Sequence, residues 1–305
     1  MSRIHEALKK AEQDRAAAQA HRVESLQTEV AAPSEAAATA EKAVPSAIAA
    51  VPSFSSQFTL EGLLERCVPG NWSPDKKTML FYDSDQARGT EEFRTLRSRL
   101  YQMRDKHPLK KVLVTSSLPK EGKSYVAANL AQAMVRQRGR RALLIDGDLR
   151  AARLHTALGT AASPGLSEYL GGEADEFAIM QRGTMENLFF IPAGRSTPNP
   201  AELVANGRLK LLFSRVESLF DWIIVDSPPA VPVSDAGVMA NHCDGVLMVV
   251  RANATPSDIA RKARAEFADR LLLGVVLNGI KGGRATYDQY YNVYGKPPDK
   301  PGIPR

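Results

Sequence analysis

Short, uninterrupted apolar runs recur along the second two thirds of the chain, each the length of one buried strand. They lie at residues 112–114, 142–145, 188–191, 222–225, 245–250 and 272–277. Stretches with apolar residues at helical spacing lie between them, over 90–103, 124–138, 200–219, 234–240 and 256–269. Fully apolar strands that alternate with helices are typical of a parallel sheet with right-handed crossovers and helices on both faces. The pattern predicts an α/β fold.

The first part of the chain has a different pattern. Residues 1–16 predict a short amphipathic helix, with Ile4, Ala7, Leu8 and Ala11 on one narrow face. Such a helix docks onto a membrane-protein partner, or it is a frayed tail without a role. Residues 17–57 are rich in Ala, Pro, Ser and Glu and predict a disordered linker. We therefore expect one domain over residues 58–284, beginning with a short helix at 58–67, and a flexible tail at 285–305.

Composition narrows the function classes without deciding among them. The chain has 305 residues, 44% of them hydrophobic, and a net charge of +6. No apolar run approaches the roughly 20 residues that cross a bilayer, and no signal-peptide pattern opens the chain, so we expect a cytoplasmic protein. The chain has no basic run with interleaved aromatic residues, so we do not expect a nucleic-acid site. The two cysteines, Cys67 and Cys243, are too few for an iron–sulfur cluster, and the histidines lack the spacing of a zinc site.

The most informative segment follows the first apolar run. A short turn ends in Gly122-Lys123-Ser124, and a helical pattern begins there. This order of strand, loop and helix is that of a phosphate-binding loop, in which backbone N–H groups cradle the phosphates; the alternative is a strand-to-helix turn without a ligand. Lys123 can reach the outer phosphates and the Ser124 hydroxyl can ligate Mg²⁺. The predicted nucleotide-binding residues are Ser117, Leu118, Pro119, Lys120, Glu121, Gly122, Lys123, Ser124 and Tyr125.

Two further strands end in carboxylates. Asp146 and Asp148 follow the run at 142–145, and Asp226 follows the run at 222–225. Ligands of open α/β sheets bind outside the carboxyl ends of the strands, so these aspartates predict a place for Mg²⁺ and its waters. The alternative is that each aspartate only caps the helix after it. The combination with Gly122-Lys123-Ser124 favours the metal site.

Read together, these motifs resemble the bacterial tyrosine kinases of exopolysaccharide and capsule synthesis, within the broader class of Min/Par-type ATPases. The resemblance covers about residues 83–294 and includes 116–124, 144–150, 165–170, 198–203, 224–229 and 275–278. It implies ATP and Mg²⁺ as cofactors. Ser124, Asp148 and Asp226 would hold the metal, and Asp146 would orient or deprotonate the incoming tyrosine. Asn278 would hydrogen-bond adenine; its alternative role is that of a turn residue.

One position separates this chain from partition and division ATPases, which carry an additional lysine near the start of the loop. Ser117 occupies the aligned position here, and it also replaces the first glycine of the common loop pattern. The lysine that would reach the nucleotide of a partner subunit is therefore missing. This departure favours the kinase family over its nearest relatives.

Two other segments fit the resemblance. Four tyrosines near the end of the chain match the family's autophosphorylation sites, although an aromatic interaction patch is the alternative: Tyr287, Tyr290, Tyr291 and Tyr294. Glu91, Arg94 and Arg97 share one stripe of the helix predicted at 90–103. In the family this Glu-x-x-Arg-x-x-Arg pattern joins subunits in a ring, so that one tail enters the next active site. The alternative is a solvated face with local ion pairs.

The sequence thus predicts a protein-tyrosine autokinase that regulates exopolysaccharide synthesis or export and phosphorylates its C-terminal tyrosines in trans. The expected partners are a separate integral membrane activator of the chain-length-determinant type, other copies of the chain in a ring, and a cognate tyrosine phosphatase. The partner would hold the kinase peripherally at the inner membrane. The alternative functions are a ParA/MinD-like ATPase that acts as a nucleotide switch, and a scaffold that binds ATP only to oligomerise.

Overall fold

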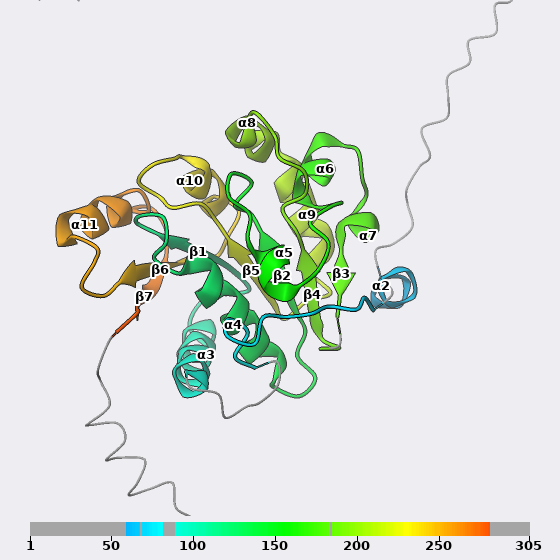
Figure 1. Cartoon of the computed structure of the whole chain (residues 1–305), viewed down its shortest axis with the longest axis horizontal. Coiled ribbons are helices and arrows are strands. Elements are labelled where there is room, and N and C mark those ends of the chain that lie inside the picture. The colour runs from blue at the N-terminus through cyan, green and yellow to red at the C-terminus, as the bar shows by residue number, and fades with distance from the viewer. Residues whose placement is uncertain (1–58, 68, 82–88, 184, 281–305) are drawn as a thin grey trace, which may run out of the picture. The chain divides into compact units, whose positions relative to one another are not determined.

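A seven-stranded, mostly parallel sheet forms the centre of the protein (Figure 1). The computed structural model describes residues 59–67, 69–81, 89–183 and 185–280. The strand order is β3-β4-β2-β5-β1-β6-β7, and only β3 pairs antiparallel to its neighbour. The strands are β1 (Lys111–Ser116), β2 (Ala142–Asp146), β3 (Gln181–Arg182), β4 (Leu188–Ile191), β5 (Trp222–Asp226), β6 (Gly245–Arg251) and β7 (Leu272–Asn278).

The six apolar runs of the sequence all form strands, which confirms the predicted α/β fold. The side chains of the central strands β1, β2 and β5 are buried because helices cover both faces, as the lack of polar alternation indicated, whereas the edge strand β7 is partly exposed, with Val275 and Leu277 open to solvent. The edge strand β3 was not predicted, because it has only two residues and both are polar. It lies beside β4 through the pairs Gln181–Phe190 and Arg182–Phe189.

The predicted helices occur in the predicted order, with corrections to their lengths, and three short helices between residues 154 and 179 were not predicted. They are α2 (Leu60–Arg66), α3 (Thr90–Arg104), α4 (Lys123–Val135), α5 (Leu154–Leu158), α6 (Leu166–Gly171), α7 (Glu176–Ile179), α8 (Pro200–Ala205), α9 (Arg208–Val216), α10 (Asp235–Ala240) and α11 (Ser257–Ala265). The single helix predicted at 200–219 is wrong. Gly207 has a φ of 82°, which breaks the segment into α8 and α9.

Two hydrophobic cores lie on opposite faces of the sheet. In Figure 1, α3 and α4 lie on one side of the strands, and α8, α9, α10 and α11 lie on the other. Alternate side chains of β1 enter the two cores: Val112 and Val114 pack with α3 and α4, whereas Leu113 packs toward α9 and α10. This double covering makes the central strands rigid supports for the loops that follow them.

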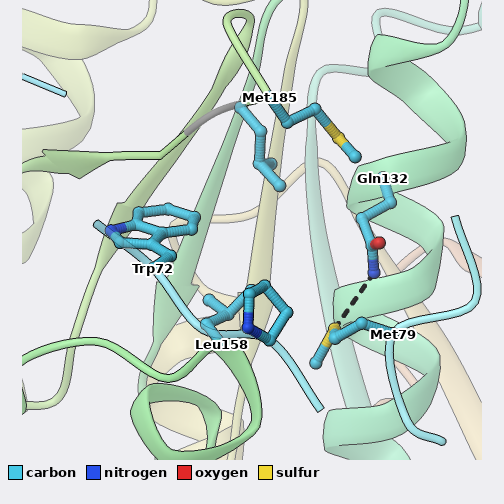
Figure 2. Close-up of a pocket in the computed structure, with 7 residues that line it drawn as sticks. Trp72, Met79, Gln132, Leu158 and Met185 are labelled. Carbon is cyan, nitrogen blue, oxygen red and sulfur yellow. Dashed lines mark hydrogen bonds between the residues drawn. The ribbon is translucent and has the colours of Figure 1, made fainter. Parts of the chain in front are cut away.

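A small cavity lies beside α4, where residues 72–79 cross the domain (Figure 2). Its volume is about 10 Å³, and Trp72, Gln132, Leu158 and Met185 are among the residues that line it. The Gln132 amide donates to the Met79 sulfur at 3.1 Å, which satisfies one polar group there. The cavity has room for one water molecule at most, so it is a packing defect and no substrate site.

Several predictions lie outside the described residues and stay predictions. They are the helix at 1–16, the linker at 17–57 and the tail at 285–305, and the limits 58–284 of the domain are likewise untested. Within the part of the chain that the structure describes, no helix is long and apolar enough to cross a membrane.

Candidate active site

The sheet brings the predicted site residues together at the carboxyl ends of its central strands. Strands β2, β5 and β1 are neighbours and run parallel, so their carboxyl ends lie side by side. Asp146 is the register partner of Asp226. Lys123 opens α4 directly after the loop that follows β1. The predicted cluster of one lysine and three aspartates is therefore present in the fold.

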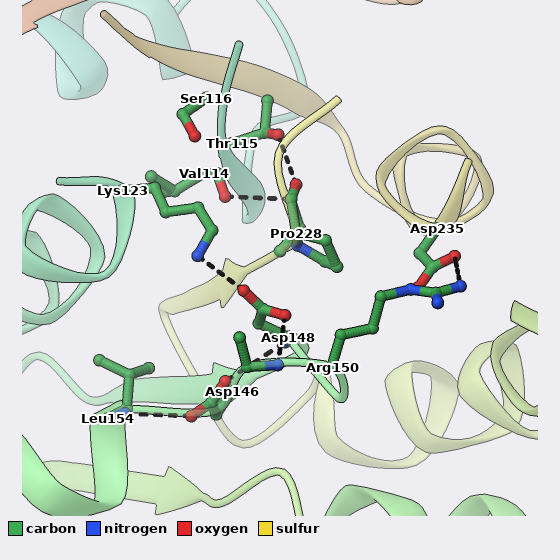
Figure 3. Close-up of polar contacts among 12 residues, drawn as sticks. Val114, Thr115, Ser116, Lys123, Asp146, Asp148, Arg150, Leu154, Pro228 and Asp235 are labelled. Carbon is green, nitrogen blue, oxygen red and sulfur yellow. Dashed lines mark hydrogen bonds and ion pairs between the residues drawn. The ribbon is translucent and has the colours of Figure 1, made fainter. Parts of the chain in front are cut away.

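Figure 3 shows Lys123 pointing toward the aspartates from the start of α4. Its ammonium lies 2.7 Å from a carboxylate oxygen of Asp148, and Asp148 is only 3% exposed. Asp146 is fully buried, and its two oxygens accept hydrogen bonds from the backbone N–H groups of Asp148, at 3.2 Å, and Leu154, at 3.1 Å. The bond to Leu154 fastens the start of α5 to the site, so Asp146 does cap a helix as well.

Asp226 differs from the other two carboxylates. It is fully buried, and neither of its oxygens has a hydrogen bond of ordinary geometry among the described residues, although the Lys123 ammonium and the Ser124 hydroxyl lie near enough to lower its pKa. A buried carboxylate without well-formed hydrogen bonds is costly, and Lys123 and Ser124 offset this cost only in part, since the pKa of Asp226 is still raised. Asp226 is thus a site poised to accept a positively charged ligand.

The electrostatics of the cluster reflect burial first and mutual repulsion second. Burial, followed by the charge of Asp226, raises the pKa of Asp146 to about 8. Burial also raises the pKa of Asp226 to about 6, although the Lys123 ammonium acts in the opposite direction. Burial alone would lower the pKa of Lys123, but the surrounding carboxylates outweigh it and the net pKa is raised. The lysine is firmly charged, and the cluster holds more negative charge than one lysine neutralises.

The loop between β1 and α4 has the backbone that a phosphate cradle requires. Lys120 and Gly122 have positive φ angles of 67° and 97°. Asn278, at the end of β7, donates from its side-chain amide to the Glu121 carbonyl at 2.9 Å. Its predicted contact with adenine is untested, and the structure adds that Asn278 supports the loop. Tyr125 packs its ring edge-on against Phe93 of α3, so its backbone is the part that can face phosphate.

Gly122 gives a direct test of this loop geometry. A Cβ at this position would lie 2.0 Å from the Asn278 amide nitrogen, and φ is in the left-handed region. We expect Gly122→Ala to displace Asn278 and to weaken nucleotide binding about tenfold or more. Isothermal titration with ADP measures the affinity. Gly139→Ala is the control, because Gly139 also has a positive φ but no neighbour within 4 Å. Unchanged affinity in Gly122→Ala would contradict this account of the loop.

Two residues near the cluster were not predicted. Asp235, at the start of α10, is 1% exposed and forms two hydrogen bonds with Arg150, at 2.8 and 3.1 Å (Figure 3). The pair ties the loop after β2 to the helix after β5. Arg150 follows Asp148 by two residues, which is a weak signal; the contact with Asp235 spans 85 positions and leaves no local pattern.

The predicted oligomer contact residues lie on α3, and they already have partners within the chain. Glu91 and Arg94 form an ion pair one helical turn apart. Arg97 donates to the carbonyl of Ala133, near the end of α4, at 2.7 Å. This bond caps α4 and turns Arg97 partly inward. The role of the three residues in a ring is untested, and Tyr287, Tyr290, Tyr291 and Tyr294 lie outside the described residues.

Comparisons with known proteins agree with this geometry. Tyrosine-protein kinase YwqD of Bacillus subtilis is 34% identical to the chain over 204 residues, which cover 66% of this chain and 86% of YwqD. This chain belongs to the bacterial tyrosine-protein kinases. Tyrosine-protein kinase CpsD of Streptococcus agalactiae is also 34% identical, over 69% of this chain and 92% of CpsD. No family model matches the chain.

A solved structure supports the same family. The kinase domain of the Escherichia coli tyrosine kinase ETK superposes with a TM-score of 0.63 at 30% identity, over 66% of this chain and 79% of the ETK domain. This chain is thus a tyrosine-protein kinase, which binds a nucleotide and transfers phosphate to tyrosine. Among the described residues, no three His, Cys, Asp or Glu side chains are grouped closely enough to hold a metal by themselves. A metal here would therefore need ligands from the nucleotide and water.

Proposed function

We propose that this chain is an ATP- and Mg²⁺-dependent tyrosine autokinase that phosphorylates its own C-terminal tyrosines in trans. The observation that supports this most is the position of Lys123, which lies at the end of a phosphate loop and faces three buried carboxylates. Phosphoryl transfer spreads negative charge over the γ-phosphate, so catalysis is mostly positioning and charge stabilisation. Lys123 and the loop N–H groups supply the positive charge.

The residues present fit Mg²⁺. The ion prefers oxygen ligands and keeps several waters, and it binds proteins through one or two carboxylates together with substrate phosphates. Ser124 would ligate it directly, and Asp148 and Asp226 would hold its waters. Two observations support this assignment: the Asp226 oxygens lack hydrogen bonds of ordinary geometry, and the Ser124 hydroxyl acts on the same carboxylate. When bound, the metal would neutralise charge that develops between the β- and γ-phosphates.

Asp146 is our candidate for the group that receives the tyrosine proton. A tyrosine hydroxyl has a pKa near 10, so at neutral pH it needs a base in position. The raised pKa of Asp146, about 8, makes its ionised form a stronger base than an ordinary carboxylate, and the fraction that is ionised rises as the pH approaches 8. Its two hydrogen bonds to backbone N–H groups fix its orientation toward the site.

The biological setting rests on the resemblance to the family. The kinase would form a ring through Glu91, Arg94 and Arg97, and a separate integral membrane activator would hold it at the inner membrane. It would regulate synthesis or export of exopolysaccharide, with a tyrosine phosphatase to reverse the modification. The kinase comparisons favour this function over a ParA/MinD-like nucleotide switch, which would hydrolyse ATP and leave tyrosine unmodified.

Labelling with ATP and Mg²⁺, followed by mass spectrometry, tests the proposal. We expect phosphotyrosine in the wild-type tail and loss of most of it when Tyr287, Tyr290, Tyr291 and Tyr294 are changed to Phe. Tyr101→Phe is the control, because Tyr101 lies on α3 and packs against Trp222. Phosphate release without phosphotyrosine, even with the cytoplasmic segment of a membrane activator added, would instead support the nucleotide switch.

Trans phosphorylation has its own test. The chain with four Phe substitutions keeps its active site, whereas a Lys123→Met chain keeps its tyrosines. Mixing the two should place phosphate on the Lys123→Met chain. Labelling only within intact wild-type chains, with none in the mixture, would show that each tail enters its own site.

A further inference from the structure

The nucleotide loop contains a buried carboxylate that phosphate binding alone does not explain. Glu121 is 3% exposed, although it lies one residue before Gly122. One of its oxygens accepts from the backbone N–H of Leu118 at 2.8 Å, and the other accepts from the Thr255 hydroxyl. A negative charge beside an anion site weakens the attraction for phosphate. The carboxylate is therefore expected to have a compensating structural role.

The segment that follows β6 makes a second contact with the same loop. Arg251 donates from its guanidinium to the Lys120 carbonyl at 3.1 Å. The Thr255 hydroxyl also accepts from the backbone N–H of Arg251 at 3.2 Å, so the threonine joins both contacts. The loop is held from outside by a segment that lies more than a hundred residues later in the sequence.

The loop sequence explains why outside support is needed. Ser117 replaces the first glycine of the common pattern. Lys120 has a φ of 67°, a left-handed backbone conformation that residues with a side chain rarely adopt. Such a backbone keeps one conformation only where its surroundings fix it. A loop fixed before the ligand arrives binds more tightly than one that must be ordered on binding.

We propose that Glu121 and Thr255 form a brace that fixes the nucleotide loop in its phosphate-binding conformation. Both are positioning residues: Thr255 orients the Glu121 carboxylate, and the carboxylate holds the Leu118 N–H. The brace deepens the proposed function, since it takes the ligand of the loop to be a nucleoside phosphate. It concerns the affinity for that ligand and leaves the chemical step to other residues.

Substitutions at Thr255 test the brace in the full-length chain. We expect Thr255→Val to weaken ADP binding about tenfold, the effect of losing one charge-assisted hydrogen bond. Thr255→Ser keeps the hydroxyl and should bind within about twofold of wild type. Thr78→Val is the matched control, because it removes a hydroxyl bond, to the Asp75 carbonyl, outside the loop. In kinase assays, Thr255→Val should raise the KM for ATP and leave kcat almost unchanged, which general damage to the fold would not produce.

A double-mutant cycle and hydrogen exchange complete the test. If the two side chains act as one unit, Thr255→Val should add almost nothing to the loss caused by Glu121→Ala. The brace would be overturned if the fold losses of ADP affinity in the two single variants multiplied in the double variant, or if Thr255→Val bound ADP as tightly as wild type. Hydrogen exchange in the ligand-free protein gives an independent result: Thr255→Val should speed exchange of the Leu118 amide, and an unchanged rate would also overturn it. Failure of the wild type to bind any nucleotide would instead refute the proposed function.

Discussion

Replacement of Lys123 by methionine is expected to lower the rate of tyrosine phosphorylation about a thousandfold or more. The ammonium is the side-chain cation that the structure places among Asp146, Asp148 and Asp226, and removal of one group that stabilises transition-state charge costs a factor of this order. The initial rate of phosphotyrosine formation at saturating ATP measures the effect. A rate within tenfold of wild type would contradict the role given to Lys123.

Lys110→Met is the matched control for this change. Lys110 lies just before β1, at the opposite end of the strand from the nucleotide loop, and its ammonium donates to the Glu217 carbonyl at 2.7 Å. Its loss removes a lysine and a hydrogen bond to a backbone carbonyl but leaves the site intact. We expect near-normal phosphorylation, which would separate the effect of Lys123 from the general effect of removing a cation.

Asp146→Asn is expected to lower phosphorylation between about a hundredfold and ten-thousandfold, the range for removal of a general base. It should also change how stability depends on pH. Because burial raises the pKa of Asp146 to about 8, its contribution to stability is fully present below about pH 4 and is lost as the pH rises to about 8. Asparagine does not ionise, so the variant does not lose this stability as the pH rises.

The two stability curves should therefore cross. Both oxygens of Asp146 accept from backbone N–H groups, and asparagine can accept only one of these bonds, so at low pH the variant should be less stable by about 1–3 kcal/mol. At pH 8 to 9 it should be the more stable protein, since one pKa unit corresponds to about 1.4 kcal/mol. Urea unfolding with a metal chelator present, at several pH values, measures this. Parallel curves would contradict the raised pKa.

Asp175→Asn is the control for the pH experiment. Asp175 caps α7 by accepting from the Ala178 N–H at 2.8 Å, and it forms a partly exposed ion pair with Arg66 at 3.3 Å. Its substitution removes a helix cap and a surface ion pair, so it should lower stability slightly, and the curves of variant and wild type should not cross. A crossing of curves in this variant as well would show that the effect at Asp146 is not specific to the buried cluster.

The sequence was sufficient for the central fold and for the cluster of charges. A fully apolar run such as 222–225 indicates a strand inside a covered sheet. Parallel strands have their carboxyl ends on the same side of the sheet, so Asp146 and Asp226 were expected to lie close together there. The break between α8 and α9 could also have been predicted, because Asn206-Gly207 is a strong turn signal within the supposed helix.

Other contacts had no signal in the sequence. Glu121 meets Thr255 across 134 positions, and Arg97 meets the Ala133 carbonyl across 36. Such pairs depend on how elements pack, and neither hydrophobic periodicity nor a local motif records that. The short helices α5, α6 and α7 have four to six residues each, too few to show a helical period. These gaps concern how the loops are held, whereas the predicted strands and their carboxyl ends carry the chemistry.

The position where strand β7 ends has a consequence for control of the enzyme. The strand ends at Asn278, whose side chain touches the nucleotide loop, and the chain runs on from there to Tyr287 within nine residues. Nine residues span at most about 30 Å. A phosphate on Tyr287 would therefore be tethered within that distance of a loop that binds a triphosphate, and like charges repel. Where the chain brings such a phosphate within about 8 Å of the loop, the Debye length at physiological salt, it would make the next nucleotide harder to capture, and added salt would relieve this effect.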